Sequence, residues 1–285
     1  MKRLFLIIVC SLWAWALSAQ PKPIALWNNV PSMKGKPTKL YAYPAPKSNN
    51  TGIVVIICPG GSYAHTMGIA TEGFEVAEWL NSQGINAFVL KYRVGSQGYH
   101  HPAMLQDVQY AIHYVRQHAK EYGYDPRKLG VMGFSAGGHL ALMAGAFAKD
   151  NQIAALGIKD DIPLRPDFVV PVYPVVSMKD EIAHKRSRRN LLTRRYTPEQ
   201  QTRFSMELSI PANMPPTFVV TAKDDPVVDY RNSVKLDQSL SKAGIPHQFL
   251  LYDTGGHGYG MSEKIAPEAG QWKKTFLKWL STLKF

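Results

Sequence analysis

Cysteine is nearly absent from this sequence, with two residues among 285. Cys10 lies in an apolar N-terminal stretch, so the rest of the chain keeps only Cys58 and cannot form an internal disulfide. A chain without disulfides depends on its hydrophobic core, which a domain of this size can supply. Cys58 follows the apolar run 53–57, and we expect it to be a small buried hydrophobic side chain. No cluster of Cys, His, Asp or Glu has metal-ligand spacing, so no metal site is expected.

Long hydrophobic runs are also scarce, and the clearest one covers residues 4–17. Lys2 and Arg3 precede this run, and a small-residue site follows it and ends at Ala19. The pattern predicts a secretory signal peptide over 1–19 that is removed after Ala19, and therefore export to the periplasm or the medium. The alternative is a membrane anchor. The run is shorter than the ~20 residues that span a bilayer, so stable membrane insertion is not expected.

Acidic residues are outnumbered, because 21 Asp and Glu stand against 33 Lys and Arg, for a formal net charge of +12. Part of the excess lies in one short stretch that contains Lys185, Arg186, Arg188, Arg189, Arg194 and Arg195. Such a run is usually a solvated surface. The functional alternative is attraction of an acidic polymer, such as a polysaccharide that carries uronic acids. Nucleic acid is not an expected partner, because the chain has no nucleic-acid-binding motif.

Apolar β-rich runs alternate with segments of helical period along most of the chain. This pattern predicts an α/β fold in one domain over 20–285, with a mainly parallel sheet covered by helices on both faces. The segment 178–210 is polar and basic, and we expect a short insertion near the active-site end of the sheet. The expected strands are 39–43 (an edge strand), 52–58, 85–92, 129–132, 168–176, 216–222 and 247–252. The expected helices are 72–81, 103–122, 139–148, 234–243 and 271–283.

A G-x-S-x-G motif centred on Ser135 lies between the apolar run 129–132 and the helix expected at 139–148. A strand, a sharp turn and a helix in this order are typical of a nucleophile elbow. Gly133 and Gly137 permit a turn that is too tight for side chains, which leaves the serine hydroxyl exposed above the sheet. We therefore predict that Ser135 is a catalytic nucleophile; the alternative is a purely structural turn.

A serine hydroxyl needs a base to remove its proton and an acid to orient that base. His257 lies in the glycine-rich loop 255–260, which allows its imidazole to approach the serine. Asp225 is the predicted acid; its neighbour Asp224 is the alternative acid, and otherwise caps the turn or holds a loop. Both loops follow expected strands, where sites in open α/β sheets are built, and the chain order of serine, acid and histidine is that of an α/β-hydrolase.

An ester carbonyl becomes an oxyanion in the transition state and needs backbone N–H donors. Ala136, directly after the serine, is one predicted donor. A Pro-Gly-Gly-Ser-Tyr loop at 59–63 follows the strand expected at 52–58, and it predicts Gly61 and Ser62 as the other donors. The alternative is an ordinary Gly-Gly turn. The predicted substrate-binding side chains are Tyr63, His65 and Tyr259.

These motifs resemble those of the secreted α/β-hydrolase esterases grouped with acetylxylan esterases and related carbohydrate esterases. The resemblance covers residues 24–283 and rests on the segments 59–63, 102–107, 133–140, 225–228 and 256–260. The basic segment is similar to an insertion that those proteins carry before the strand that leads to the acid. The resemblance implies hydrolysis of acetyl esters on plant-wall polysaccharides or oligosaccharides such as acetylxylan, through an acyl-enzyme and without a cofactor.

Other activities occur on the same fold, including cleavage of feruloyl esters, of general short-chain esters and of peptides. A prolyl-oligopeptidase-like peptidase shares the Asp-x-x-Val and Gly-x-His-Gly loops, but those enzymes usually carry a large extra domain for which this chain has no room. A non-enzymatic hydrolase-fold binding protein is the least favoured alternative. Such proteins commonly lose the nucleophile or the histidine, and both are present here.

Overall fold

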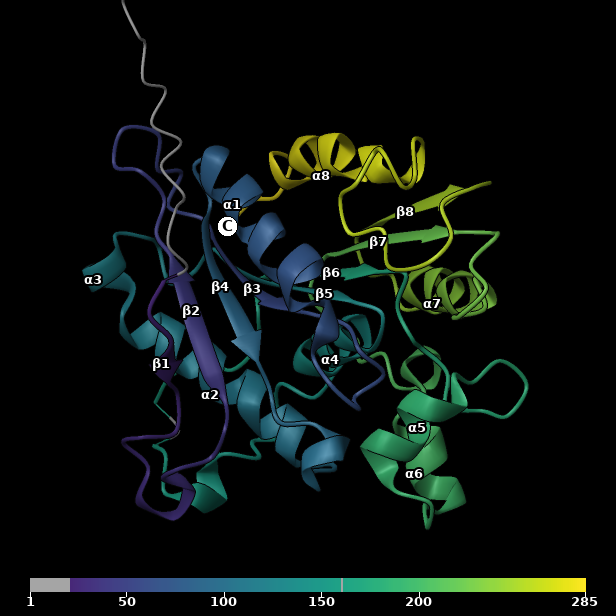
Figure 1. Cartoon of the computed structure of the whole chain (residues 1–285), viewed down its shortest axis with the longest axis horizontal. Coiled ribbons are helices and arrows are strands. Elements are labelled where there is room, and N and C mark those ends of the chain that lie inside the picture. The colour runs from purple at the N-terminus through teal and green to yellow at the C-terminus, as the bar shows by residue number, and fades with distance from the viewer. Residues whose placement is uncertain (1–20, 160) are drawn as a thin grey trace, which may run out of the picture.

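The computed structural model describes residues 21–159 and 161–285 (Figure 1). The predicted signal peptide lies outside the described residues. An eight-stranded sheet forms the centre, in the order β1-β2-β4-β3-β5-β6-β7-β8. Its strands are β1 (Ile24–Ala25), β2 (Lys39–Tyr43), β3 (Val54–Cys58), β4 (Asn86–Lys91), β5 (Leu129–Phe134), β6 (Phe168–Val172), β7 (Thr217–Ala222) and β8 (His247–Tyr252).

Six of the strands, β3 to β8, are parallel to one another, whereas β1 and β2 pair in antiparallel fashion at one side. The prediction of a mainly parallel sheet is confirmed. The prediction that 39–43 is an edge strand is wrong, because the two residues of β1 pair outside β2. Strand β1 has only two residues, which pair with Leu40 and Lys39. A strand this short produces no periodic pattern in the sequence, so it could not be predicted.

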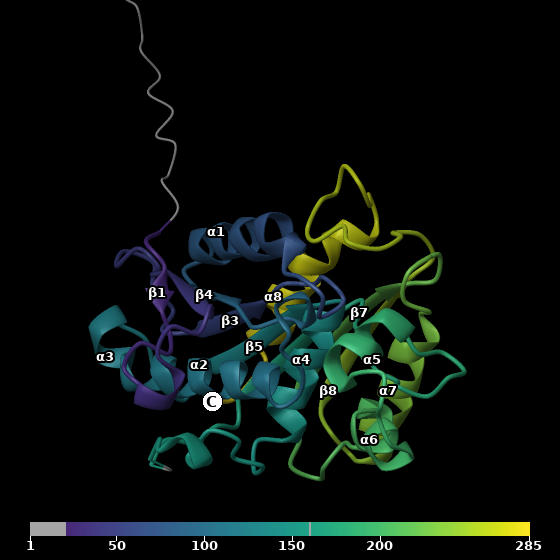
Figure 2. The ribbon, with the colours of Figure 1, turned by 60° about the horizontal axis from the view of Figure 1, so that its bottom comes forward.

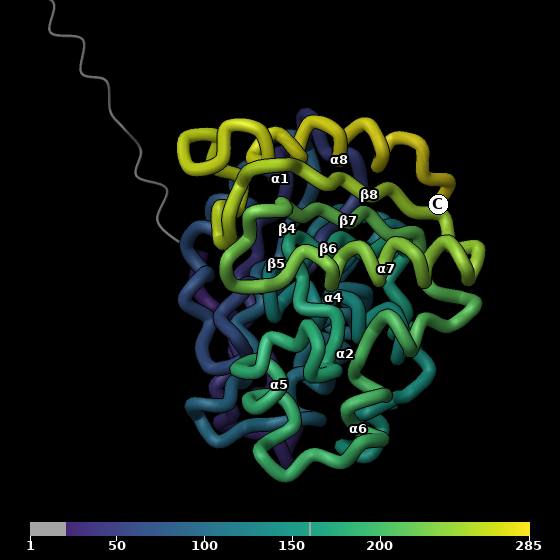
Figure 3. The backbone as a smooth tube through the Cα atoms, turned by 90° about the vertical axis from the view of Figure 1, so that its right-hand side faces the viewer, coloured from purple at the N-terminus to yellow at the C-terminus, as the bar shows by residue number. Residues whose placement is uncertain are grey.

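Helices cover both faces of the sheet, as predicted. Figures 2 and 3 show α1 (Glu75–Ser82) and α8 (Trp272–Leu280) on one face and α2 (Ala103–Gln117), α4 (Ala136–Ala146) and α7 (Arg231–Lys242) on the other. The strand side chains alternate between these layers. In β3, Val54 and Ile56 pack with the α2 side, and Val55 and Ile57 pack with the α1 side. Cys58 is fully buried, as expected.

The other expected helices differ from the structure by up to three residues at an end, and two expected helices differ in more than the positions of their ends. The helix expected at 103–122 is divided at His118 into α2 and α3 (Ala119–Tyr122). The helix expected at 72–81 begins with a π-helical turn, η3 (Ala70–Phe74), before α1. The wider turn matters for the site described below, because it contains Glu72.

The basic segment between β6 and β7 contains two helices, α5 (Lys185–Leu192) and α6 (Pro198–Arg203), and the 3₁₀ turn η6 (Met206–Leu208). A capping box at Thr197 and Gln200 begins α6. Not all of the six basic side chains are solvated: Arg188 is buried, and its guanidinium bonds Asp180 and the carbonyl oxygen of Met178. Within the described ranges, no helix combines the length and the apolar character that a membrane crossing requires.

Candidate active site

Ser135 lies between the carboxyl end of β5 and the first residue of α4, in a strained backbone conformation with φ 54° and ψ −119°. The two glycines of the motif explain how the turn closes. A Cβ added to Gly133 would lie 2.0 Å from the carbonyl oxygen of Gly137, and a Cβ added to Gly137 would lie 2.0 Å from that of Cys58. Only glycine allows strand and helix to approach this closely.

The three side chains predicted as nucleophile, base and acid lie in one hydrogen-bonded chain. His257 Nε2 is 2.9 Å from Ser135 Oγ, and His257 Nδ1 is 2.6 Å from Asp225 Oδ2. Ser135 and Asp225 come from loops after β5 and β7, and His257 comes from the loop after β8. The carboxyl ends of these parallel strands meet at one edge of the sheet, which brings together side chains that are 122 residues apart.

Hydrogen bonds to Asp225 determine the proton positions in this chain. Its Oδ1 accepts the backbone N–H groups of Val227 and Val228 at 2.8 and 2.9 Å, and its side chain is fully buried. With Oδ1 occupied by these two donors, Oδ2 is the atom that accepts the Nδ1–H of His257. Nε2 is then left to accept the proton of Ser135. This is the tautomer that a general base requires.

Asp224, the alternative acid, has a different position. It is exposed, and its Oδ1 accepts the N–H of Gly256 at 2.8 Å, next to the histidine. Asp224 therefore connects the loop after β7 to the loop that carries His257. Of the two carboxylates, Asp225 is the one that contacts the imidazole.

The Gly-Gly loop predicted to supply oxyanion donors lies directly against the nucleophile. A Cβ added to Gly60 would lie 3.1 Å from Cβ of Ser135. The N–H groups of Gly61 and Ser62 donate to no acceptor in the described part of the chain. Gly61 has φ 136° and Ser62 has φ 58°, so the loop holds an unusual backbone conformation. Ala136 begins α4, where N–H groups have no partner within the helix.

A buried carboxylate that the sequence analysis did not identify holds this loop. Glu72 Oε2 accepts the N–H of Gly60 at 2.7 Å, and Oε1 accepts the hydroxyl of Tyr173 at 2.9 Å. Burial raises the pKa of Glu72, while both hydrogen bonds and the nearby His257 favour its ionised form. At the start of an expected helix, a glutamate is ordinary, so its sequence position contains no signal of this role.

Tyr173, the second residue missed, connects Glu72 to the histidine loop. Its hydroxyl accepts the N–H of Gly260 at 2.9 Å, and its ring centroid is 4.9 Å from that of His257. Tyr173 has φ 35° and follows β6, in the region where Pro171 and Pro174 predicted an irregular strand end. The prolines therefore indicated an unusual backbone, but not which side chain it orients.

Tyr63 and Tyr259, predicted to bind substrate, lie inside the protein and are 0% and 1% exposed. The hydroxyl of Tyr63 donates to Nδ1 of His139 at 2.9 Å, and Nε2 of His139 donates to the carbonyl oxygen of Phe204. Burial lowers the pKa of His139 to about 4, so this histidine is neutral near pH 7. The ring of Tyr259 packs edge-on against Tyr173.

His65 is partly exposed beside the Gly-Gly loop and remains a candidate for substrate contact. Its Nε2 is 3.4 Å from Nη2 of Arg186 on α5. Because a guanidinium can only donate, Nε2 accepts. The Nδ2 group of Asn190, also on α5, donates to the carbonyl oxygen of Ser62 at 2.9 Å. Helix α5 thus contacts both the oxyanion loop, at Ser62, and His65, which follows that loop.

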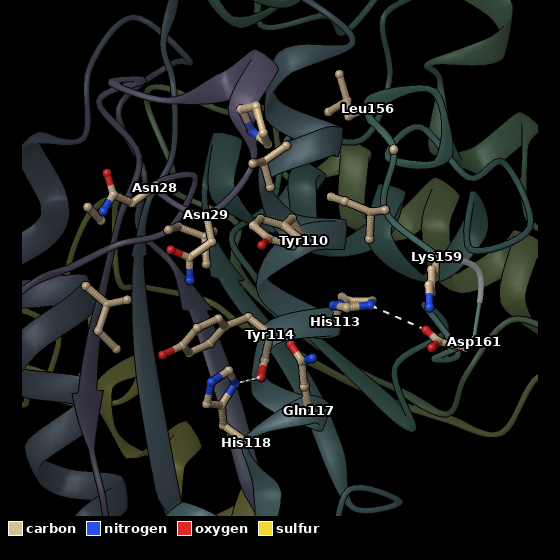
Figure 4. A pocket seen from close by; sticks show the side chains of 17 residues that line it. Asn28, Asn29, Tyr110, His113, Tyr114, Gln117, His118, Leu156, Lys159 and Asp161 are labelled. Atoms are coloured by element: carbon tan, nitrogen blue, oxygen red, sulfur yellow. Dashed lines mark hydrogen bonds and ion pairs between the residues drawn. The ribbon is translucent and has the colours of Figure 1, made fainter.

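A separate hollow of about 580 Å³ contains none of the predicted site residues. Figure 4 shows its lining of Tyr110, His113, Tyr114 and His118 from α2 and the residues after it, across from Asn28 and Asn29. In the described parts of the chain, no three His, Cys, Asp or Glu side chains are grouped so that they could hold a metal ion. The residues around Ser135 have the geometry that nucleophilic catalysis requires.

Comparisons with known proteins identify the family to which the chain is similar. Residues 40–240 match the BD-FAE family model. An acetylxylan esterase of Xylanibacter ruminicola is 29% identical over 237 residues, which are 80% of this chain and 46% of that protein. Endo-1,4-beta-xylanase B of Butyrivibrio fibrisolvens is 34% identical over 212 residues, which are 72% of this chain and 32% of that protein. This chain therefore spans less than half the length of these two relatives.

The crystal structure of an acetyl ester-xyloside bifunctional hydrolase from Caldicellulosiruptor lactoaceticus superimposes with a TM-score of 0.81. It is 33% identical, and the alignment covers 94% of this chain and 100% of that chain. An alpha/beta hydrolase enzyme from a deep-sea metagenome library superimposes with a TM-score of 0.66 at 24% identity, over 91% of this chain and 95% of that one, and shows the shared fold alone.

Proposed function

The chain belongs to the BD-FAE family of α/β-hydrolase esterases, and from this premise we propose that it is a serine esterase that removes acetyl groups from plant-wall polysaccharides or oligosaccharides such as acetylxylan. The fold class expected from the sequence is confirmed by this membership. The ester hydrolase activity is part of the proposal, because the chain spans less than half the length of the two curated relatives. The serine mechanism and the polysaccharide substrate form the rest of the proposal. The observation that carries it is the hydrogen-bonded chain from Ser135 through His257 to Asp225.

In the first half of the reaction, Ser135 Oγ attacks the acetyl carbonyl carbon while His257 Nε2 takes the hydroxyl proton. The new imidazolium is stabilised by the carboxylate of Asp225 at 2.6 Å. Collapse of the tetrahedral intermediate breaks the bond to the sugar oxygen, which leaves with the proton from His257. Water then attacks the acyl-enzyme through the same base and releases acetate and free Ser135.

The negative charge of each tetrahedral intermediate lies on the former carbonyl oxygen, which accepts hydrogen bonds from the N–H groups of Gly61, Ser62 and Ala136. Each such donor contributes about 100-fold to 1,000-fold in rate. The amides of Gly61 and Ser62 have no protein acceptor in the described chain, so they are available to the oxyanion. The bond from Gly60 to Glu72 orients the loop before substrate arrives.

The choice of an acetylated glycan rests on the relatives and on the predicted export. The names of the relatives refer to acetylxylan, to acetyl ester and xyloside hydrolysis, and to xylan cleavage. Export after cleavage near Ala19 would place the enzyme where plant-wall polymers are found. Feruloyl and general short-chain esters remain the alternatives to be compared in the assay.

Substitution of the nucleophile tests the proposal. Ser135→Ala should abolish acetate release from acetylated xylan and hydrolysis of p-nitrophenyl acetate, and should prevent labelling by a fluorophosphonate. The control variant Ser241→Ala removes the hydroxyl of a serine on α7, far along the chain from the elbow, and should keep all three properties. Undiminished turnover in folded Ser135→Ala would refute the serine mechanism. Release of ferulate but not acetate would refute the proposed substrate.

A further inference from the structure

Helix α5 is fixed at the mouth of the candidate active site. Asn190 bonds the oxyanion loop at Ser62, and its own carbonyl oxygen is 2.8 Å from Nδ1 of His100. The backbone N–H of His101 donates to the carbonyl oxygen of Leu191 at 2.8 Å. These contacts come from two separate loops, so the side chains that α5 presents to solvent have a defined position relative to Ser135.

The exposed cations of this region are not neutralised by the protein. Arg188 is the exception, because it is buried, pairs with Asp180 at 2.6 Å and lies over the ring of Tyr196. The exposed basic residues of α5 and the following loop form no ion pair with any described carboxylate; these residues are Lys185, Arg186, Arg189, Arg194 and Arg195. A helix that needed its charges only for folding would pair more of them.

Arg186 contacts a residue beside the candidate oxyanion loop. Among the described residues, its guanidinium has one hydrogen-bonding neighbour, Nε2 of His65, and the backbone carbonyl of His65 lies against Gly61. Burial, together with the charge of Arg186, lowers the pKa of His65, so the imidazole is neutral near pH 7 and leaves the guanidinium charge uncompensated. A guanidinium with free N–H groups is suited to bidentate binding of a carboxylate.

A further hollow lies beside the residue that Arg186 contacts. Its volume is about 280 Å³, and its lining includes His65, Thr66, Lys91, Ser96 and Gln97. Hydroxyl, amide and ammonium groups are suited to sugar hydroxyls and to a further anionic substituent. The cations are spread along α5 and the loop to Arg195 instead of converging on one point, which fits charges that are distributed along a polymer better than a single phosphate.

We infer that Arg186 and the exposed cations of α5 form a subsite for uronic acid carboxylates carried by the acylated glycan. This inference rests on the proposed function and adds the class of polysaccharide that is preferred. The carboxylate of a side-chain uronic acid is held by Arg186 while the acetyl group of a neighbouring sugar lies at Ser135. The remaining cations attract the polymer at longer range and are screened by salt.

The test compares acetylated glucuronoxylan with the same polymer after chemical reduction of its carboxyl groups. At low salt we expect kcat/KM to be about threefold to tenfold higher on the unreduced polymer, and the ratio to approach one at about 0.5 M sodium chloride. Arg186→Gln should lower the low-salt ratio by more than half, and the remaining cations account for the part that is left. Lys120→Gln removes an exposed charge on α3, at the opposite side of the molecule (Figure 1), and should keep the wild-type ratio.

Rates are divided by the p-nitrophenyl acetate turnover of each variant, so that differences in the chemical step cancel. An equal kcat/KM of the wild type on both polymers, or a ratio that Arg186→Gln leaves unchanged, would overturn the inference while the esterase proposal stands. Absence of p-nitrophenyl acetate and acetylxylan hydrolysis by the wild type would instead overturn the proposed function.

Discussion

Replacement of Glu72 by glutamine changes one buried group that contacts both sides of the candidate active site. In the wild type, the carboxylate accepts hydrogen bonds from the N–H of Gly60 on the oxyanion loop and from the hydroxyl of Tyr173 beside His257. Glutamine has nearly the same shape, but only one of its two terminal atoms accepts. If its carbonyl oxygen keeps the bond to Gly60, its NH₂ group faces Tyr173, whose hydroxyl already accepts the N–H of Gly260.

The size of the effect follows from the bond that is lost. A hydrogen bond to a charged acceptor contributes about 1.5 to 3 kcal/mol, and each 1.4 kcal/mol corresponds to about a factor of ten. We therefore expect Glu72→Gln to lower kcat about 10-fold to 100-fold. KM should change little, because Glu72 is buried behind the loop and does not face solvent. A positioning residue acts on the transition state through the groups that it orients.

The pH dependence gives a second measurement that a general loss of packing would not produce. Burial raises the pKa of Glu72, so in the wild type this carboxylate takes up a proton as the pH falls through the raised value, which weakens its bonds to Gly60 and Tyr173. Glutamine cannot take up this proton. The acid limb of the kcat/KM profile should therefore move to lower pH in Glu72→Gln, and remain in place in the control Glu75→Gln, which removes an exposed carboxylate one turn away.

The stability of the folded protein should also depend on pH through Glu72, and it should fall as the pH rises. Burial raises the pKa of Glu72, so the folded protein keeps a proton there at pH values at which the unfolded chain has lost it. This residue therefore makes the wild type less stable as pH rises from the ordinary value to the raised one, and Glu72→Gln should lack that decrease. Kinetics of Glu72→Gln equal to those of Glu75→Gln, with an unshifted acid limb, would refute a positioning role.

The remaining predictions concern the acid, the oxyanion loop and a buried histidine. Asp225→Asn should lower kcat on p-nitrophenyl acetate by about 1,000-fold to 10,000-fold, because Asp225 contacts the imidazole. Asp224→Asn weakens one bond to a loop amide and should lower kcat about tenfold at most. A larger effect of Asp224→Asn than of Asp225→Asn would exchange their roles. Gly61→Ala should abolish turnover because the added Cβ would lie 2.1 Å from a carbonyl oxygen, and wild-type rates would contradict the loop's role. Burial lowers the pKa of His139 to about 4, so it stays neutral in the folded protein where the unfolded chain is protonated. The free energy of unfolding from urea titrations should therefore fall by roughly 3 kcal/mol more in the wild type than in His139→Gln between about pH 6.5 and pH 4, and parallel curves would contradict this.

The sheet and the elbow could be predicted from the sequence because their signals are local. Apolar runs bounded by turn residues gave β8 its bounds, 247–252, and placed β3, β5 and β7 within two residues at their carboxyl ends. Gly133 lies against Gly137 within five residues of chain, and Gly137 also lies against Cys58 at the end of the neighbouring strand β3. Pairing of β1 outside β2 depends on only two residues, so the position of the sheet edge had no comparable signal.

The direction of individual side chains near the site could not be predicted in the same way. Tyr63 and Tyr259 both follow glycine-rich motifs, and adjacency to such motifs suggested contact with substrate. In the structure, positive φ at Ser62 and Tyr63 turns the first ring into the core, and the second packs on Tyr173. A residue's distance in sequence from a functional loop does not determine which face of that loop its side chain occupies.

The candidate triad was accessible from sequence because parallel strands bring their carboxyl ends to one edge whatever the details of packing. The exact positions of the triad side chains depend on residues that no motif identifies. Glu72, held in a π-helical turn, and Tyr173, held at φ 35°, connect Gly60 on one side of Ser135 to Gly260 on the other. The nucleophile and the base thus lie on short motifs that tolerate little change, whereas their separation is set by two buried side chains. Substitutions at these two positions should therefore alter kcat without altering any recognisable catalytic motif.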